Sequence, residues 1–162
     1  MMKAKDLMIG DIVRVAKDVC LKKGTIVIVH AIDADNRFTE RGLVGSATCV
    51  AVDDEDRMSW GIWTEFLEPV PLTVEILEKN GWKHEFDKTE YMVKYDLGKE
   101  GKNCWMMWSI KEHNLDVQRQ DEKLDMYNLK VSRVVIPCDY VHQLQHAMGM
   151  CGIEKDLALE AQ

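Results

Sequence analysis

Residues 68 to 72 read Glu68-Pro69-Val70-Pro71-Leu72, and this stretch divides the chain into two parts. Proline lacks a backbone N–H and restricts the preceding residue to extended conformations, so two prolines two residues apart disfavour both a helix and a central strand. The stretch therefore predicts an extended connector. With 162 residues in all, each side of the connector is long enough for a small domain.

Before the connector, short strand-forming runs alternate with turns. Hydrophobic and β-branched residues fill 12–15, 25–29 and 43–52, and a further segment from about residue 58 contains Trp60 and Trp63. The pairs Gly10-Asp11 and Lys23-Gly24 supply turns. Four or five short strands at this spacing predict a small, closed or nearly closed, SH3-like antiparallel β-barrel over residues 1–70.

After the connector, the pattern predicts an α+β domain over residues 71–162. Thr73 and Gly81 are suited to begin and end a short helix over 73–80. Antiparallel strands are expected over about 82–136, with a turn at 98–101. A helical period of hydrophobic residues then predicts a helix over about 139–151 that covers one face of the sheet, with Asp139 as its N-cap.

One predicted strand of this second domain is hydrophobic on both faces. Cys104, Met106 and Trp108 alternate with Trp105 and Met107, and successive side chains of a strand point to opposite sides of the sheet. We expect the helix to cover one side only. The other side then exposes a patch rich in Trp and Met, which are residue types enriched at protein interfaces.

Composition and charge exclude several classes of protein. With 21 basic and 28 acidic side chains, the formal charge is −7, and residues 1–70 hold 9 of the basic and 12 of the acidic ones. An acidic balance in both halves disfavours nucleic acid as a partner. No run approaches the length of a membrane span and no secretory leader opens the chain, so we expect a cytoplasmic protein with reduced cysteines and no contact with membranes.

Three motifs resemble those of a family of proteins from Bacteroides-type gut bacteria, their prophages and phages, to which no activity is assigned. They are Leu7-x-Ile9-Gly10-Asp11, the run from Pro69 to Trp82 with its Pro-Leu-Thr-x-Glu-Ile-Leu-x-Lys-x-Gly-Trp pattern, and Tyr140-Val141-His142-x-Leu144-Gln145. The similarity extends over nearly the whole chain. It implies a cytosolic protein of bacterial or mobile-element origin and assigns no role to any residue.

His142 and His146 stand four residues apart, the spacing at which two helical imidazoles share a metal ion. In the zinc-protease motif a glutamate follows the first histidine as general base, and this chain has Gln143 there. An amide cannot accept that proton. On a helical wheel both histidines lie opposite the hydrophobic stripe, so we predict two solvated side chains and no metal site.

Other catalytic signatures are weak. Cys138 precedes the predicted helix, a position that lowers the pKa of a thiol, although a buried, inert cysteine is the more common case. Phosphate-binding glycine loops do not occur. The acidic run Asp53-Asp54-Glu55-Asp56 lacks the ligand spacing of a calcium loop and predicts a solvated hairpin tip. We therefore expect neither a cofactor nor an enzymatic activity.

The aromatic residues are the remaining indication of function. Trp60 and Trp63 lie late in the predicted barrel, and Trp105 with Met107 lies on the uncovered sheet face. Together they predict a non-enzymatic protein-binding or adaptor module, with these four residues as the candidate binding site. The alternative is nucleic-acid binding by basic residues of the first strands, and a metal- or thiol-dependent enzyme is a remote one. The basic residues are Lys3, Lys5, Arg14, Lys17, Lys22 and Lys23.

Overall fold

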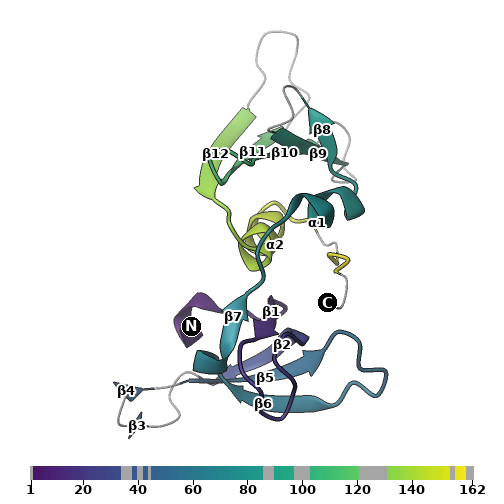
Figure 1. The fold of residues 1–162 in the computed structure, drawn as a ribbon. Helices are drawn as coiled ribbons and strands as arrows, with labels where there is room; N and C mark the ends of the chain where they lie inside the picture. The colour runs from purple at the N-terminus through teal and green to yellow at the C-terminus, as the bar shows by residue number, and fades with distance from the viewer. Residues whose placement is uncertain are drawn as a thin grey trace. The chain divides into compact units, whose positions relative to one another are not determined.

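The computed structural model of the protein describes residues 2–33, 38–39, 42–43, 45–85, 90–96, 103–120, 131–153 and 156–159. It is a mixed α+β structure that contains two antiparallel five-stranded sheets (Figure 1). The chain forms two compact units, Met1–Val70 and Pro71–Leu159. The turn expected at 98–101 lies outside the described residues. No helix in the described ranges is long and apolar enough to cross a membrane.

The first unit is built on one sheet with the strand order β6-β5-β2-β1-β7. Its strands are β1 (Ile12–Val15), β2 (Ile26–Asp33), β5 (Ser46–Ala51), β6 (Ser59–Trp63) and β7 (Leu67–Pro69). Short 3-10 helices precede β1 (η1, Ala4–Asp6) and β7 (η2, Thr64–Phe66), and β3 (Phe38–Thr39) pairs with β4 (Gly42–Leu43). The outer strands β6 and β7 do not pair within the described part of the chain, so the expected closed barrel is not found.

Every second side chain along β1 and β2 points into the core of the first unit. Val13, Val15, Val27 and Val29 are fully buried and pack with Leu67 and their neighbours in one hydrophobic cluster. β-Branched side chains fit the half-buried surface of a sheet well, which is why these segments form strands.

The turn before β1 depends on Gly10 and Asp11. Gly10 has a φ of +94°, a conformation that strains any residue with a Cβ. The carboxylate of Asp11, which is buried, accepts a hydrogen bond from the backbone N–H of Met8 at 2.7 Å. These two residues lead the chain from the N-terminal segment into the sheet.

The second unit contains a sheet with the strand order β12-β11-β10-β9-β8. The strands are β8 (Lys83–Glu85), β9 (Glu90–Asp96), β10 (Asn103–Ser109), β11 (Asn114–Gln120) and β12 (Val131–Pro137). Every neighbouring pair is antiparallel. The sheet is therefore a simple up-and-down meander in which sequence neighbours are spatial neighbours.

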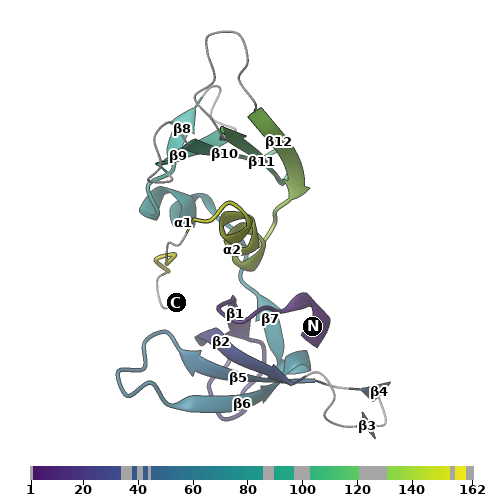
Figure 2. The same ribbon diagram turned by 180° about the vertical axis from the view of Figure 1, so that it is seen from behind.

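Two helices, α1 (Val74–Lys79) and α2 (Val141–Met150), lie on one face of this sheet, as both views of the ribbon show (Figures 1 and 2). On the covered face Met106 and Trp108 of β10 are buried, as are Leu144 and Met148 of α2. The indole Nε1 of Trp108 donates a hydrogen bond of 2.7 Å to the carbonyl of Cys138. The covered face thus has a hydrophobic interior in which the indole N–H of Trp108 is hydrogen-bonded.

The start of α2 differs from the prediction. Asp139 does not cap the helix; Tyr140 occupies the N-cap position, and the side-chain oxygen of Gln143 accepts hydrogen bonds from the backbone N–H groups of Asp139 and Tyr140 at 2.8 and 3.2 Å. The carboxylate of Asp139 instead lies 3.1 Å from Nδ1 of His113. Gln143 therefore has a structural role, because it satisfies donors that the first turn of a helix leaves unpaired.

Candidate functional site

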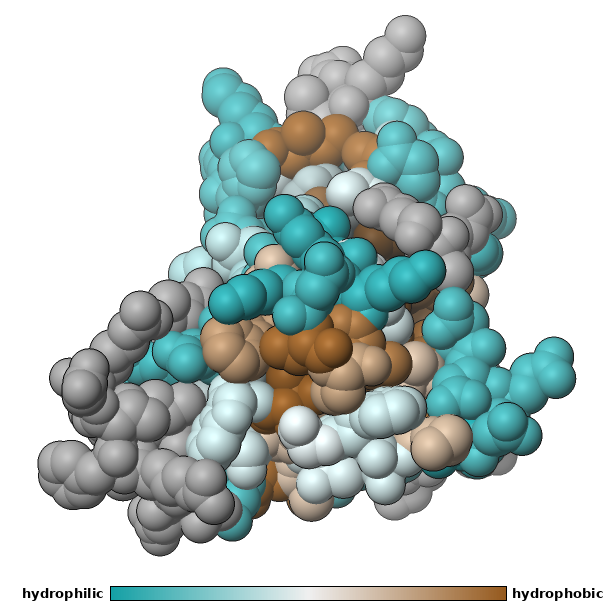
Figure 3. Space-filling model, turned by 60° about the horizontal axis from the view of Figure 1, so that its bottom comes forward, coloured by the Kyte–Doolittle hydropathy of each residue, from teal (hydrophilic) through white to brown (hydrophobic). Residues whose placement is uncertain are grey.

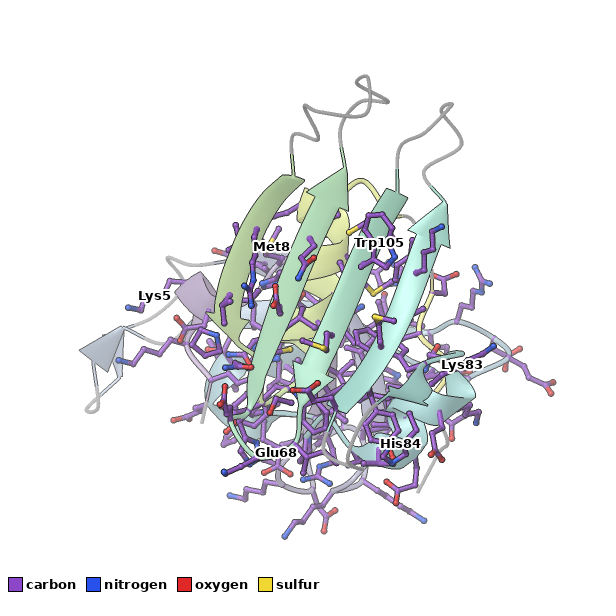
Figure 4. All side chains as sticks on the ribbon, turned by 90° about the horizontal axis from the view of Figure 1, so that it is seen from above. Lys5, Met8, Glu68, Lys83, His84 and Trp105 are labelled. Carbon is purple, nitrogen blue, oxygen red and sulfur yellow. The ribbon has the colours of Figure 1, made fainter. Side chains whose placement is uncertain are left out.

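The face of the second sheet that points away from α1 and α2 is the candidate site, and we call it the open face. In Figure 4 it is turned toward the viewer, with α2 behind the sheet and Trp105 labelled. Strand pairing assigns to this face the side chains of Lys83, Glu90, Met92, Lys94, Trp105, Met107, Asp116, Gln118, Arg133 and Val135. No described element of this unit lies over it.

Trp105 lies in a row of four side chains that crosses the strands. It pairs with Lys94 on β9 and with Gln118 on β11, and Gln118 pairs in turn with Arg133 on β12. The Nζ atom of Lys94 lies 5.3 Å from the centre of the Trp105 ring, within the range of a cation–π interaction. Trp105 is partly exposed, so part of the indole remains accessible beside a fixed positive charge.

The next row is mainly hydrophobic. Met107 pairs with Met92 on β9 and with Asp116 on β11, and Asp116 pairs with Val135 on β12. Both methionines are partly exposed and Val135 is 52% exposed. Methionine is flexible and polarizable, so it adapts to different partner surfaces.

Asp116 is the buried charge of this face. It is 5% exposed, and its carboxylate accepts hydrogen bonds from Nε and Nη2 of Arg133, the shortest at 2.6 Å. These bonds raise the pKa of Arg133 above its ordinary value. A buried carboxylate needs such a partner, and Arg133 in turn is held in one orientation while 63% of its side chain stays exposed.

The two tryptophans of the first unit do not form a joint site. Trp60 and Trp63 are three residues apart on β6, so they point to opposite faces of the sheet. Trp60 pairs with Cys49, which is buried, and packs against the hydrophobic cluster of the first unit. Its Nε1 atom is buried and has no hydrogen-bond partner in the described ranges. Trp63, partly exposed, pairs with Ser46 at the end of the strand.

The expectation that His142 and His146 are both solvated is wrong for His142, which is 7% exposed. Its ring is stacked on Tyr140 with the centroids 5.8 Å apart and meets the ring of His146 edge-on at 5.7 Å. The rings of Tyr140 and His146 therefore pack against His142, although the helical wheel places His142 on the polar face of the helix. Among the described residues no group of three metal-ligating side chains occurs.

Cys138 is buried, the case that the sequence analysis favours over an activated thiol. Burial, together with the negative charge of Asp139, raises the pKa of this thiol to about 12. Burial likewise raises the pKa of Cys49 to about 12. Cys104 and Cys151 are buried, whereas Cys20 is exposed. A thiolate is the reactive form of cysteine, so Cys138 is not poised as a nucleophile.

The basic residues of the first strands have separate environments. Arg14 forms an ion pair with Glu68 at 2.7 Å, and Nζ of Lys17 lies 5.5 Å from the centre of the Phe66 ring. At the tip between β5 and β6, the carboxylate of Asp54 accepts hydrogen bonds from the backbone N–H groups of Asp56 and Met58. The acidic run thus folds into a turn with its other three carboxylates exposed.

Large hydrophobic side chains also reach the surface elsewhere, and brown areas between teal ones mark such positions on the face drawn in Figure 3. The exposed ones are Met8, Ile9, Val19, Val52, Met58, Val134, Val135 and Met150. Only on the open face do several strands bring partly exposed Trp and Met side chains together with fixed charges, among the residues that the structure describes.

Sequence reasoning missed two features of the second unit. The pair of Arg133 with Asp116 needs the register of β11 and β12. Asn80, 4% exposed, binds Ala158 across 78 residues: its side chain donates to the carbonyl at 3.1 Å and accepts from the N–H at 3.0 Å. A buried asparagine directly before Gly81 is a signal for such a clamp, because asparagine side chains often hydrogen-bond to the backbone.

Comparisons of the chain with protein-family models, with curated proteins and with solved structures find no match.

Proposed function

We propose that this chain is a non-enzymatic protein-binding or adaptor module, and that its partner binds the open face around Trp105 and Met107. The observation that carries the proposal is a sheet with helices on one face and partly exposed Trp105, Met92 and Met107 on the other. Tryptophan and methionine are enriched at protein interfaces, and tryptophan is frequent among residues that dominate binding energy.

For the first unit we propose an SH3-like barrel that is open between β6 and β7. Four strands pair in succession, and β7 follows the 3-10 helix η2 and returns beside β1. This order supports the proposal. Trp60 packs against the core of this unit, so we assign the main binding surface to the second unit and leave Trp63 as a secondary contact.

We also propose that the chain belongs to the family of bacterial and phage proteins that its three motifs resemble. In the structure the residues of these motifs have structural roles: Gly10 and Asp11 form a turn, Thr73 accepts a hydrogen bond from the N–H of Ile76 at the start of α1, and Leu144 is buried. These roles support a shared fold and carry no activity from the family to this chain.

The proposal is tested by affinity capture from the native host, with and without nuclease, with wild-type protein and the variant Trp105→Ala/Met107→Ala. A protein partner that the wild type retains and the variant loses supports the proposal. The variant Trp60→Phe is the control, because it leaves the open face unchanged. Equal capture by all three proteins, or capture that nuclease abolishes, would overturn the proposal in favour of another surface or of nucleic acid.

A further inference from the structure

We infer that two copies of this chain associate through β12, whose outer edge pairs antiparallel with the same edge of the second copy and brings the two Val134 side chains together. The inference concerns an edge of the second sheet and not the open face, so it goes beyond the proposed function and does not depend on it. It is drawn from the direction of the backbone groups of β12 and from the order of its side chains.

The direction of the backbone groups follows from one hydrogen bond. The N–H of Cys138 donates to the carbonyl of His113 at 2.9 Å, and these two residues flank the pair of Pro137 with Asn114. In an antiparallel ladder, a bond between flanking residues identifies a pair whose own N–H and C=O groups point away from the partner strand. The backbone carbonyl of Pro137 therefore points away from β11.

The same direction recurs at every second residue of the strand, because hydrogen-bonded and non-hydrogen-bonded pairs alternate along an antiparallel ladder. The register of β11 and β12 runs without a shift from Asn114↔Pro137 to Gln120↔Val131. Val131, Arg133 and Val135 thus also direct their N–H and C=O groups away from β11. β12 is the last strand of the order, and no described strand pairs with this side (Figures 1 and 2). Another extended strand completes such a row of donors and acceptors.

β12 lacks the features that normally keep sheet edges from pairing. Edge strands are usually short, bulged, or interrupted by proline or charged side chains. β12 has 7 residues, whereas the other strands at the ends of the two sheets, β6, β7 and β8, have 5, 3 and 3. Val134 and Val135 point to opposite faces of the sheet and are 54% and 52% exposed. The charge of Arg133 is already paired with Asp116 at 2.6 Å, and Pro137 stands at the end of the strand.

The order of the side chains makes this edge complementary to itself. A two-fold axis at Arg133 would place two arginines opposite each other, which is unfavourable. An axis at Val135 would leave the outward groups of Val131 beyond the end of the partner strand. An axis at Val134 pairs Arg133 with Val135 of the second copy. It also brings the N–H of Val131 to the carbonyl of Pro137, so every outward residue has a partner. A contact in which both copies use the same patch is the common geometry of homodimers.

Val134 occupies the central position of this register. Its pair is of the non-hydrogen-bonded kind, in which the two Cα atoms are about 4.5 Å apart. Two exposed valine side chains therefore come into contact and are removed from water. The second sheets of the two copies then form one continuous sheet.

The test is sedimentation velocity of the full chain over a range of micromolar concentrations. We expect a reversible dimer. Val134→Lys and Val134→Glu should each raise its Kd about fivefold or more, because like charges meet at the axis. An equimolar mixture of the two variants should recover the dimer, since opposite charges then meet. Val52→Lys makes the same change on an exposed residue of the first unit and should associate as the wild type does.

A disulfide tests the register independently of the affinity. In a Cys20→Ser background, which removes the exposed thiol, Val134→Cys should form a disulfide-linked dimer under mild oxidation, because the Cα spacing of such a pair suits a disulfide. Val52→Cys in the same background should stay unlinked. A wild-type chain that is monomeric at all concentrations would overturn the inference. So would a dimer that both charge variants retain, or one that neither recovers in the mixture nor crosslinks through position 134.

Discussion

The carboxylate of Asp116 on β11 and the guanidinium of Arg133 on β12 face each other across a strand pair, with Oδ2 and Nη2 2.6 Å apart. Asp116 is buried, whereas most of the Arg133 side chain is exposed. Both side chains belong to the open face of the second sheet. The pair both satisfies a buried charge and fixes a cation at the surface.

Removing Arg133 alone should destabilise the second unit more than removing both partners. Arg133→Gln leaves a buried carboxylate without its partner, whereas Asp116→Asn/Arg133→Gln leaves two neutral groups that can bond to each other. We expect the melting temperature of the single variant to fall by several degrees and that of the double variant to recover most of the loss. Circular dichroism melts of both variants check this; equal melting temperatures would show that the pair does not stabilise the sheet.

Trp108→Phe should lower the free energy of unfolding more than Trp60→Phe does, because only the first change removes a hydrogen bond. The first change removes the donor to the buried carbonyl of Cys138, at a cost of roughly 1–3 kcal/mol. The second removes an indole N–H that has no partner in the described ranges. Urea unfolding of the two matched variants measures the difference, and a larger loss in Trp60→Phe would contradict the hydrogen-bond assignment.

Asn80→Ala should release the segment of residues 156–159 from the second unit. Its side chain makes two hydrogen bonds to Ala158 and a third to the carbonyl of Ile76 at 2.8 Å, so the change removes three hydrogen bonds, each of which contributes roughly 0.5–1.5 kcal/mol. Limited proteolysis followed by mass spectrometry should detect faster cleavage near the C-terminus. Exposed Glu78→Ala on α1 is the control and should be cleaved as slowly as the wild type.

Cys20 should be the one thiol of the native chain that reacts rapidly with Ellman's reagent, because the other four cysteines are buried. Unfolding in urea should release all five thiols. The variant Cys20→Ser should abolish the rapid reaction in native protein. A second rapid thiol in that variant would contradict the burial of Cys49 or Cys138.

The raised pKa values of Cys49 and Cys138 also predict alkaline loss of stability. Folding raises each pKa from its ordinary value of 9.0 to about 12, so the folded state disfavours the thiolate. The contribution is fully present below pH 9 and is lost as the pH rises toward 12. Melting temperatures measured over this range should fall less in Cys49→Ala/Cys138→Ala than in the wild type, even if the variant begins lower.

The sequence allowed the two faces of β10 to be separated, since Met106 and Trp108 are buried and Trp105 and Met107 are partly exposed. Period-two alternation follows from strand geometry alone, so no tertiary information is needed. The same rule places Trp60 and Trp63 on opposite faces of the first sheet. Whether the barrel closes could not be predicted in this way. Closure requires β6 to pair with β7, the two strands at the ends of the strand order, and the pattern within single strands does not show which strands pair.

The environment of single side chains could not be predicted from periodicity. His142 lies opposite the hydrophobic stripe of the helix but is buried against the rings of Tyr140 and His146. A helical wheel predicts burial only from the positions of hydrophobic residues, so it does not detect this contact. The Asp116–Arg133 pair requires the register of two strands that are separated in the sequence by residues 121–130. Such effects depend on tertiary contacts.

Photo-crosslinking from position 107 shows directly whether a partner binds the open face. The variants Met107→p-benzoylphenylalanine and Val52→p-benzoylphenylalanine, the second on an exposed residue of the first unit, are irradiated in the native host and treated with nuclease. We expect a discrete crosslinked protein from position 107 that is absent from position 52 and is lost when Trp105 is changed to alanine. No crosslink from position 107, or the same products from both positions, would contradict a binding surface on the open face.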